Sequence, residues 1–402
     1  MATQSWVGGP VGLDAHVRTT MVGTRAVLVM VPTMTAGTRL MDLVPLFDGD
    51  HRVQVVFTVP QADLVWHGLD RYATGLGGLV VPWDQALRHE WDLVLSASHR
   101  LIERVHGRLL LLPHGAGAAK SRLYSRKSGG ARVPTTGLDR ETLTYRGRVL
   151  PSAVGIPTSR EMRLLGRTCP EAAPAAFLAG DICLDSLRAG LPYRERYRDA
   201  FGVGVGELVV VSSTWSPHSL FGRRPEFYER ITRELPNATV AAVLHPHIWA
   251  VHGEWQVRSW LARARADGLV VVPPERGWQA AMVAADVVVG DHGSTTLYAA
   301  ALGRRVCVAA WPEQDIRAGS PAAVLRQAVP MLDHARPLAE QLARVEPVTD
   351  TRVVEAVSSV PGHSHARFRT AMYDLLGLPE PDWPARAQAP LVPRLHRGEA
   401  SC

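Results

Sequence analysis

The chain has 402 residues, of which 46% are hydrophobic and 20% are charged, and its formal net charge at pH 7 is +6. This length exceeds what one hydrophobic core usually serves, so we expect two domains, and the modest charge does not indicate a nucleic-acid partner. No apolar run approaches the ~20 residues that span a bilayer, and the amino-terminal residues lack the layout of a secretion signal, so we expect a cytoplasmic protein.

Short apolar runs in the first half of the chain have the pattern of strands that are buried on both faces. They lie at residues 26–31, 52–58, 93–98 and 108–113, with helical stretches such as residues 37–47 between some of them. This alternation predicts a mostly parallel sheet covered by helices. We assign residues 1–24 to a flexible amino terminus and residues 25–190 to an amino-terminal, acceptor-side domain of Rossmann type.

A basic segment at residues 118–148 interrupts this domain. It carries eight Lys or Arg residues against Asp139 and Glu141, and it has little apolar periodicity. The composition is typical of a long surface loop. A solvated loop and a strip that contacts an anionic acceptor or membrane face are both consistent with it. Under the second interpretation the contacts come from four side chains: Lys120, Arg122, Arg126 and Lys127.

The second half repeats the alternation more clearly. Its apolar runs lie at residues 208–214, 239–246, 269–273, 286–291 and 305–311, with helical spacing between them. We therefore predict a second doubly wound domain over residues 191–378, which ends in an amphipathic helix at 363–377. The Pro-rich tail at 379–402 is predicted to be disordered. The predicted fold class is α/β, with two Rossmann-type domains expected to face a central cleft.

The stretch "VVVGDHGSTTLYAAALGRRV" (287–306) places small polar residues where a buried strand gives way to a helix. The first turn of a helix exposes backbone N–H groups that stabilise an anion, and small residues allow an anion to approach. An ordinary helix cap is the alternative. The candidate phosphate-binding residues here are Asp291, Gly293, Ser294, Thr295 and Thr296.

Other strand ends also carry polar residues. Ser213 and Thr214 end one strand of the second series, His245 ends the next, and His114 follows the four-leucine run of the first series. Because the carboxyl ends of parallel strands meet at one edge of a sheet, this gathering favours a ligand site over isolated caps.

The order of several motifs resembles the CDP-glycerol glycerophosphotransferase family, the teichoic-acid-type polymerases and primases of the GT-B superfold. The motifs are "PHGAGAAK" (113–120), "GDICLD" (180–185), "SSTW" (212–215), "LHP" (244–246) and "DHGSTTLYAAALGRRV" (291–306). The resemblance spans residues 108–312. It implies a GT-B-like arrangement of the two domains. It also implies that His114 is the base acting on the acceptor hydroxyl, and that His245, Asp291, Ser294 and Thr295 contact the donor phosphates.

The resemblance implies a transferase that moves a polyol-phosphate or glycosyl group from a CDP- or UDP-linked donor to a hydroxyl acceptor. A role in cell-envelope polymer or glycoconjugate synthesis and a lipid-linked acceptor at the inner membrane face are consistent with it. The alternatives are a UDP-sugar epimerase-like enzyme and a non-catalytic nucleotide-binding protein. We expect no tightly bound cofactor and no nucleic acid. Because no compact carboxylate cluster accompanies the motifs, we also expect no metal.

Overall fold

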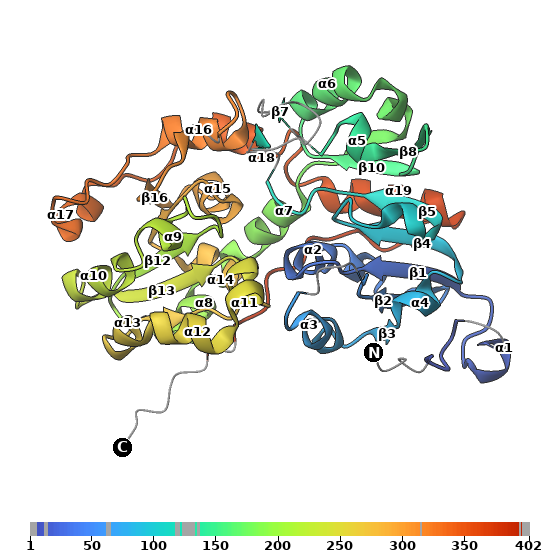
Figure 1. The fold of residues 1–402 in the computed structure, drawn as a ribbon, viewed down its shortest axis with the longest axis horizontal. Helices are drawn as coiled ribbons and strands as arrows, with labels where there is room; N and C mark the ends of the chain where they lie inside the picture. The colour runs from blue at the N-terminus through green and yellow to red at the C-terminus, as the bar shows by residue number, and fades with distance from the viewer. Residues whose placement is uncertain are drawn as a thin grey trace. The chain divides into compact units, whose positions relative to one another are not determined.

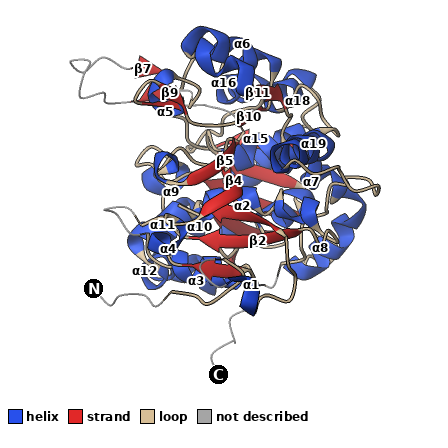
Figure 2. Cartoon of the chain, turned by 90° about the vertical axis from the view of Figure 1, so that its right-hand side faces the viewer, coloured by secondary structure: helices blue, strands red, loops and turns tan. Residues whose placement is uncertain are grey.

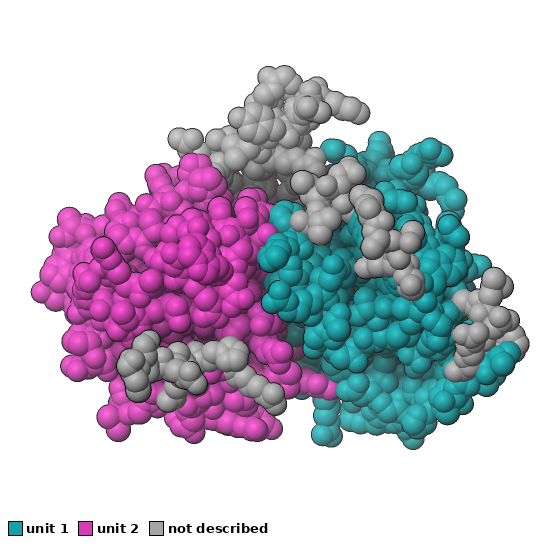
Figure 3. All heavy atoms as spheres, turned by 60° about the horizontal axis from the view of Figure 1, so that its bottom comes forward, with its two compact units in different colours: residues 1–115, 137–183, 359–387 teal, residues 116–136, 184–358, 388–402 magenta. Residues whose placement is uncertain are grey.

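The computed structural model of the chain describes residues 6–11, 15–61, 66–116, 121–122, 133–134, 137–313, 316–393 and 395. Contacts divide the chain into two compact units. Unit 1 comprises residues 1–115, 137–183 and 359–387, and unit 2 comprises residues 116–136, 184–358 and 388–402 (Figure 3). Within the described residues, no helix is both long and apolar enough to cross a membrane.

Unit 1 contains a sheet of seven parallel strands in the order β11-β10-β5-β4-β1-β2-β3 (Figure 1). The strands are β1 (Arg25–Met30), β2 (Val53–Thr58), β3 (Leu79–Val81), β4 (Glu90–Ser96), β5 (His106–Leu111), β10 (Ala153–Ile156) and β11 (Ala176–Leu178). The four runs predicted as strands form β1, β2, β4 and β5, and the other three strands are additional to the prediction.

The helices of unit 1 cover both faces of this sheet. They are α1 (Ala15–Arg18), α2 (Met34–Leu40), η1 (Val44–Phe47), α3 (Leu69–Gly75), α4 (Trp83–Ala86), η2 (Ile102–Arg104), α5 (Arg140–Leu143), α6 (Ser159–Thr168), η3 (Pro170–Ala175) and α19 (Ser364–Leu376). In β1, Val27 and Val29 pack with α2, α3 and α19, whereas Leu28 and Met30 pack with α4 and α6. Successive strand residues point to opposite faces, so burial on both faces requires an unbroken apolar run.

Unit 2 contains a sheet of five parallel strands in the order β14-β13-β12-β15-β16. The strands are β12 (Leu208–Ser213), β13 (Thr239–Leu244), β14 (Val270–Val271), β15 (Val287–Gly290) and β16 (Arg305–Val308). Each matches a run predicted as a strand. Because both sheets are parallel with helical connections, the α/β prediction is confirmed.

The helices of unit 2 lie mainly between consecutive strands. They are α8 (Arg194–Phe201), α9 (Leu220–Arg223), α10 (Phe227–Glu234), α11 (Pro246–His252), α12 (Glu254–Trp260), α13 (Ala262–Ala266), α14 (Trp278–Ala284), α15 (Ser294–Ala301), α16 (Pro321–Ala328), α17 (Leu338–Ala343) and α18 (Thr351–Val357). Figure 2 shows the helices of the chain in blue and its strands in red. Helix α7 (Ile182–Ala189) and η4 (Leu191–Tyr193) connect the two sequence halves, and β8 (Thr144–Tyr145) and β9 (Arg148–Val149) form a short antiparallel pair in unit 1.

Residues 359–387, near the carboxyl terminus, belong to unit 1. Phe368, Met372 and Tyr373 of α19 are buried in the core that also contains Val27 and Val29. Residues 379–393, where we expect disorder, contain no helix or strand, yet Glu380 pairs with Arg369 at 2.7 Å. Helix α19 thus belongs to the same unit as the first sheet, whereas the sequence predicts one domain over residues 191–378.

Candidate functional site

The order in which the chain adds strands to the unit 2 sheet reverses between β12 and β15. The chain runs outward from β12 through β13 to β14 and then returns to the other side of β12 with β15 and β16. At such a point the loops that follow two neighbouring strands leave toward opposite faces, and ligands of open α/β sheets bind between them. We refer to the region between these two loops as the crevice. Residues 212–214 end β12 and residues 291–294 follow β15, so the predicted residues of these two stretches meet at this point.

Asp291 is fully buried and organises the crevice. Its Oδ2 atom accepts hydrogen bonds from the Thr214 N–H and hydroxyl, both at 2.9 Å, and from the Leu220 N–H at 3.0 Å. Its Oδ1 atom accepts the Gly293 N–H at 3.0 Å. With both oxygens engaged by protein donors, this carboxylate ties the loop after β12 to the start of α15, so it positions the crevice and needs no ligand.

Helix α15 begins in this crevice without a side-chain cap. The first hydrogen bond of the helix runs from the Leu297 N–H to the Gly293 carbonyl at 3.2 Å. The preceding N–H groups, those of Ser294, Thr295 and Thr296, donate to no acceptor in the part of the chain that the structure describes. Three unused N–H groups at the positive end of a helix dipole form a cradle for an anion.

Gly293 lies close to side chains of the loop after β12 and of Asp291. A Cβ atom added there would lie 2.7 Å from the Thr214 Cγ2 atom and 3.2 Å from the Asp291 Oδ1 atom. The first distance is shorter than real Cβ contacts, so a side chain at this position would displace the Thr214 methyl group. The glycine predicted as a phosphate contact therefore also leaves room for the Thr214 side chain.

The hydroxyl groups of the helix start point in different directions. The Ser294 Oγ atom accepts the Ala116 N–H at 3.2 Å, and the Thr295 hydroxyl hydrogen-bonds with the Ser212 hydroxyl. Thr296 is fully buried, and a Cβ atom at Gly290 would lie 2.1 Å from its Oγ1 atom, so this hydroxyl packs onto β15. At Thr296 the backbone N–H is therefore the group suited to a ligand, because the side chain faces the core.

Two histidines, His245 and His247, follow β13, the strand that neighbours β12. His245 caps α11, and its Nδ1 atom accepts the His247 N–H at 3.1 Å, so a neutral His245 ring carries its proton on Nε2. His247 lies with its ring centroid 4.4 Å from that of Trp215, which is 49% exposed. Loss of hydration, followed by the nearby His252, lowers the pKa of His247. These rings border the β12 and β13 ends with a partly apolar surface suited to a base or sugar.

His292 takes no part in this polar surface. It is 3% exposed, and its ring meets the Trp311 ring edge-on at a centroid distance of 6.2 Å.

Ser213, the last residue of β12, is also buried. Its hydroxyl accepts the Phe221 N–H at 2.9 Å and donates to the Thr214 carbonyl. Ser213 therefore shapes the loop after β12, because its hydroxyl is occupied on both sides.

Unit 1 has its own group of polar residues at strand ends. His114 follows β5, and its side chain is exposed to solvent. Its pKa is lowered below its ordinary value by the protein atoms that replace part of its hydration and then by the Arg39 charge, while a hydrogen bond with the Ala97 backbone opposes the shift. Arg39 pairs with Asp181 at 3.1 Å, and both side chains are buried. A neutral, accessible imidazole can accept a proton at neutral pH.

His99 is a second imidazole at this edge, and it is not among the residues predicted from the sequence. It follows β4, the neighbour of β5, and its buried Nδ1 atom has no hydrogen-bond partner among the described residues. Loss of hydration, then the His114 charge, lowers its pKa to about 4, against a smaller opposing effect of Asp139. The "SASHR" run after a predicted strand is the signal that could have identified it. Arg39 lies within a helix, where no local pattern distinguishes it.

The predicted anionic-surface contacts fall largely outside the described residues. Lys120, Arg126 and Lys127 lie in stretches the structure does not describe. The backbone of Arg122 belongs to β6 (Ser121–Arg122), which pairs antiparallel with β7 (Val133–Pro134) in unit 2. The contacts of these four side chains therefore stay a prediction.

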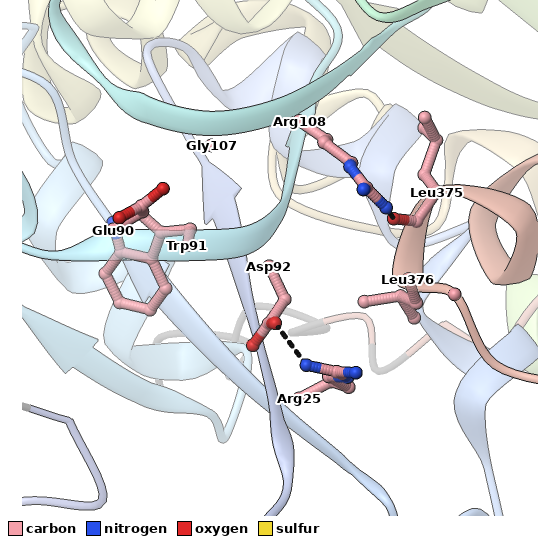
Figure 4. Close-up of a pocket in the computed structure, with 9 residues that line it drawn as sticks. Arg25, Glu90, Trp91, Asp92, Gly107, Arg108, Leu375 and Leu376 are labelled. Carbon is pink, nitrogen blue, oxygen red and sulfur yellow. Dashed lines mark hydrogen bonds and ion pairs between the residues drawn. The ribbon is translucent and has the colours of Figure 1, made fainter.

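A pocket of about 690 Å³ lies at the amino-terminal edge of the unit 1 sheet, at the other end of the strands from His114 and His99 (Figure 4). Arg25 pairs there with Asp92 at 3.0 Å, and Arg108 donates to the Leu375 carbonyl at the end of α19. Both arginines already have protein acceptors, and the pocket contains none of the predicted site residues. Across the described ranges there is no group of three or more His, Cys, Asp or Glu side chains that could hold a metal ion.

Comparison with known proteins identifies the fold. No protein-family model and no curated protein sequence matches the chain. Among solved structures, a histidine-to-asparagine variant of the wall teichoic acid polymerase TagF is 12% identical, with a TM-score of 0.59 and 88% of each chain covered. The same variant soaked with CDPG is also 12% identical, with a TM-score of 0.53 over 88% of each chain.

The S. aureus MnaA–UDP complex is 11% identical to the chain, with a TM-score of 0.50, and covers 90% of this chain and 100% of its own. At these identities the likeness establishes the fold and no more. The chain is therefore an α/β protein with two parallel sheets and a GT-B-like fold.

Proposed function

We propose that the protein is a transferase that moves a polyol-phosphate or glycosyl group from a nucleotide-diphosphate donor to a hydroxyl acceptor. The observation that carries this proposal is the uncapped start of α15 at the switch point between β12 and β15. Its three unused N–H groups can donate hydrogen bonds to the oxygens of a phosphate group, and the helix dipole favours the negative charge of that group. The GT-B-like fold supports the proposal, because TagF has been soaked with CDPG and MnaA has been solved with UDP.

In this proposal the donor phosphates bind to the N–H groups of residues 294–296, and His245 contributes its Nε2–H group. As the bond to the leaving group breaks, negative charge accumulates on the departing nucleotide. Donors that are already oriented in the folded protein stabilise that charge without reorganising, which is the largest contribution to catalysis in many enzymes. Trp215 and His247 are proposed to contact the base or sugar at the edge of the crevice.

His114 is proposed as the general base of the acceptor side. The acceptor oxygen forms a bond to the donor phosphorus or anomeric carbon, its proton passes to His114, and the nucleotide leaves with the electron pair of the broken bond. A base in this role typically contributes about 10² to 10⁴ in rate. The lowered pKa of His114 supports the assignment, because a neutral ring can receive the proton.

The test is a donor panel. The protein is incubated with CDP- and UDP-linked donors and a hydroxyl acceptor, and the released nucleotide is identified. A nucleoside monophosphate indicates polyol-phosphate transfer, whereas a nucleoside diphosphate indicates glycosyl transfer. His114→Ala should abolish release and leave donor binding unchanged. Binding without release from any donor favours the alternative of a non-catalytic nucleotide-binding protein, and isomerised donor without transfer favours the epimerase alternative.

A further inference from the structure

A cluster of arginines lies at the amino-terminal edge of the unit 2 sheet, at the other end of the strands from α15. Arg194 and Arg198 are one turn apart on α8 and therefore share a face of that helix. Arg304 directly precedes β16. The register pairs Val287 with Arg305, so Asp286 and Arg304 lie opposite each other at the start of the two strands.

Asp286 is already saturated by other donors. Its Oδ1 atom pairs with Arg194 at 2.5 Å, and its Oδ2 atom pairs with Arg198 at 2.5 Å and accepts the Leu208 N–H at 2.7 Å. Arg198 also donates to the Gly206 carbonyl at 2.8 Å. The carboxylate therefore holds two guanidinium groups and one backbone donor, which leaves it little capacity for a third arginine.

Arg304 is that third arginine. Its backbone is fixed, because its N–H donates to the Ala299 carbonyl and its carbonyl accepts the Val348 N–H, both at 3.1 Å. Its side chain is partly buried, and its buried Nε–H has no acceptor within the described part of the chain. Loss of hydration, then the Arg194 charge, lowers the pKa of Arg304 to about 10. The buried Nε–H of Arg194 likewise has no acceptor among these residues.

We propose that Arg194, Arg198 and Arg304 form a binding site for a phosphate-type oxyanion. A guanidinium group that has lost part of its hydration gains most from an acceptor with several oxygens, and a tetrahedral oxyanion can accept from two neighbouring guanidinium groups at once. The only other carboxylate paired with these arginines in the described chain is that of Glu195, 3.5 Å from both Arg194 and Arg198 and highly exposed, so the cluster keeps net positive charge. The next arginine, Arg305, is paired with Glu207 at 2.6 Å.

The test is a thermal-shift titration with inorganic phosphate, with sodium chloride at matched ionic strength as the baseline. Phosphate should raise the melting temperature of the wild-type protein. Arg304→Gln should weaken the apparent affinity for phosphate by about tenfold. The matched control is Arg263→Gln, because Arg263 is exposed on α13 of the same unit and should leave the affinity unchanged.

A purely structural role for Arg304 is tested in phosphate-free buffer. Arg304→Gln should melt at or above the wild-type temperature, because it removes a positive charge from beside Arg194 and Arg198. A lower melting temperature there, an absent phosphate shift in the wild type, or equal phosphate affinity in the wild type and Arg304→Gln would overturn the proposal. Donor binding at α15 should survive in Arg304→Gln, so failure of this site and failure of the proposed function are distinguishable.

Discussion

The lowered pKa of His114 predicts how the activity depends on pH. Its ordinary pKa of 6.5 is lowered in the folded protein, chiefly by lost hydration and then by Arg39. A base works in its neutral form, so activity should fall on the acidic side at a lower pH than an ordinary histidine would require. The acidic midpoint of the kcat/KM profile, which reports groups of the free enzyme, should therefore lie below pH 6.5.

Arg39 provides the control for this interpretation. Arg39→Gln removes a positive charge near His114 and leaves the Asp181 carboxylate without that partner, and both changes favour the protonated imidazole. The acidic midpoint should move upward in this variant, while Arg39→Gln combined with Asp181→Asn should show a smaller shift. An acidic midpoint that is identical in all three proteins would exclude His114 as the titrating base.

The start of α15 and the loop after β12 depend on one buried carboxylate. Asp291→Ala would leave the N–H groups of Thr214, Leu220 and Gly293 without their acceptor. An unsatisfied buried donor costs about 1 to 3 kcal/mol, so we expect the free energy of unfolding to fall by ~3 kcal/mol or more. Urea denaturation measures this loss. The control Glu355→Ala, at an exposed position of α18, should stay within ~0.5 kcal/mol of the wild type.

The strands of unit 2 could be predicted because burial on both faces demands continuous apolar runs, as at Val287–Val289. The orientation of the polar residues that follow them could not. Ser294, Thr295 and Thr296 look alike in sequence, yet their hydroxyls meet Ala116, Ser212 and the β15 backbone respectively. Those directions depend on partners far away in the chain, so local pattern identified the place where the site lies but not the role of each side chain.

The local sequence pattern also could not predict which distant segments of the chain pack together. Helix α19 has the amphipathic spacing that predicts a helix, and it begins at Ser364 and ends at Leu376. Nothing in that spacing says that Phe368 packs edge-on against Phe177 of β11, with ring centroids 5.6 Å apart. Similarly, the three-residue strands β3 and β11 are too short for a periodic signal, and their pairing with longer neighbours defines them.

The most direct test of the account asks whether backbone N–H groups at α15 bind the donor phosphates. Ser294→Ala removes the hydroxyl and keeps the N–H, whereas Ser294→Pro removes both. Proline is favoured at the first position of a helix, and Gly293 already has the extended conformation that a following proline requires (φ −75°, ψ 157°). Calorimetric titration with CDP and UDP should show about tenfold weaker binding for Ser294→Pro than for Ser294→Ala. Equal affinities in two folded variants would contradict the account.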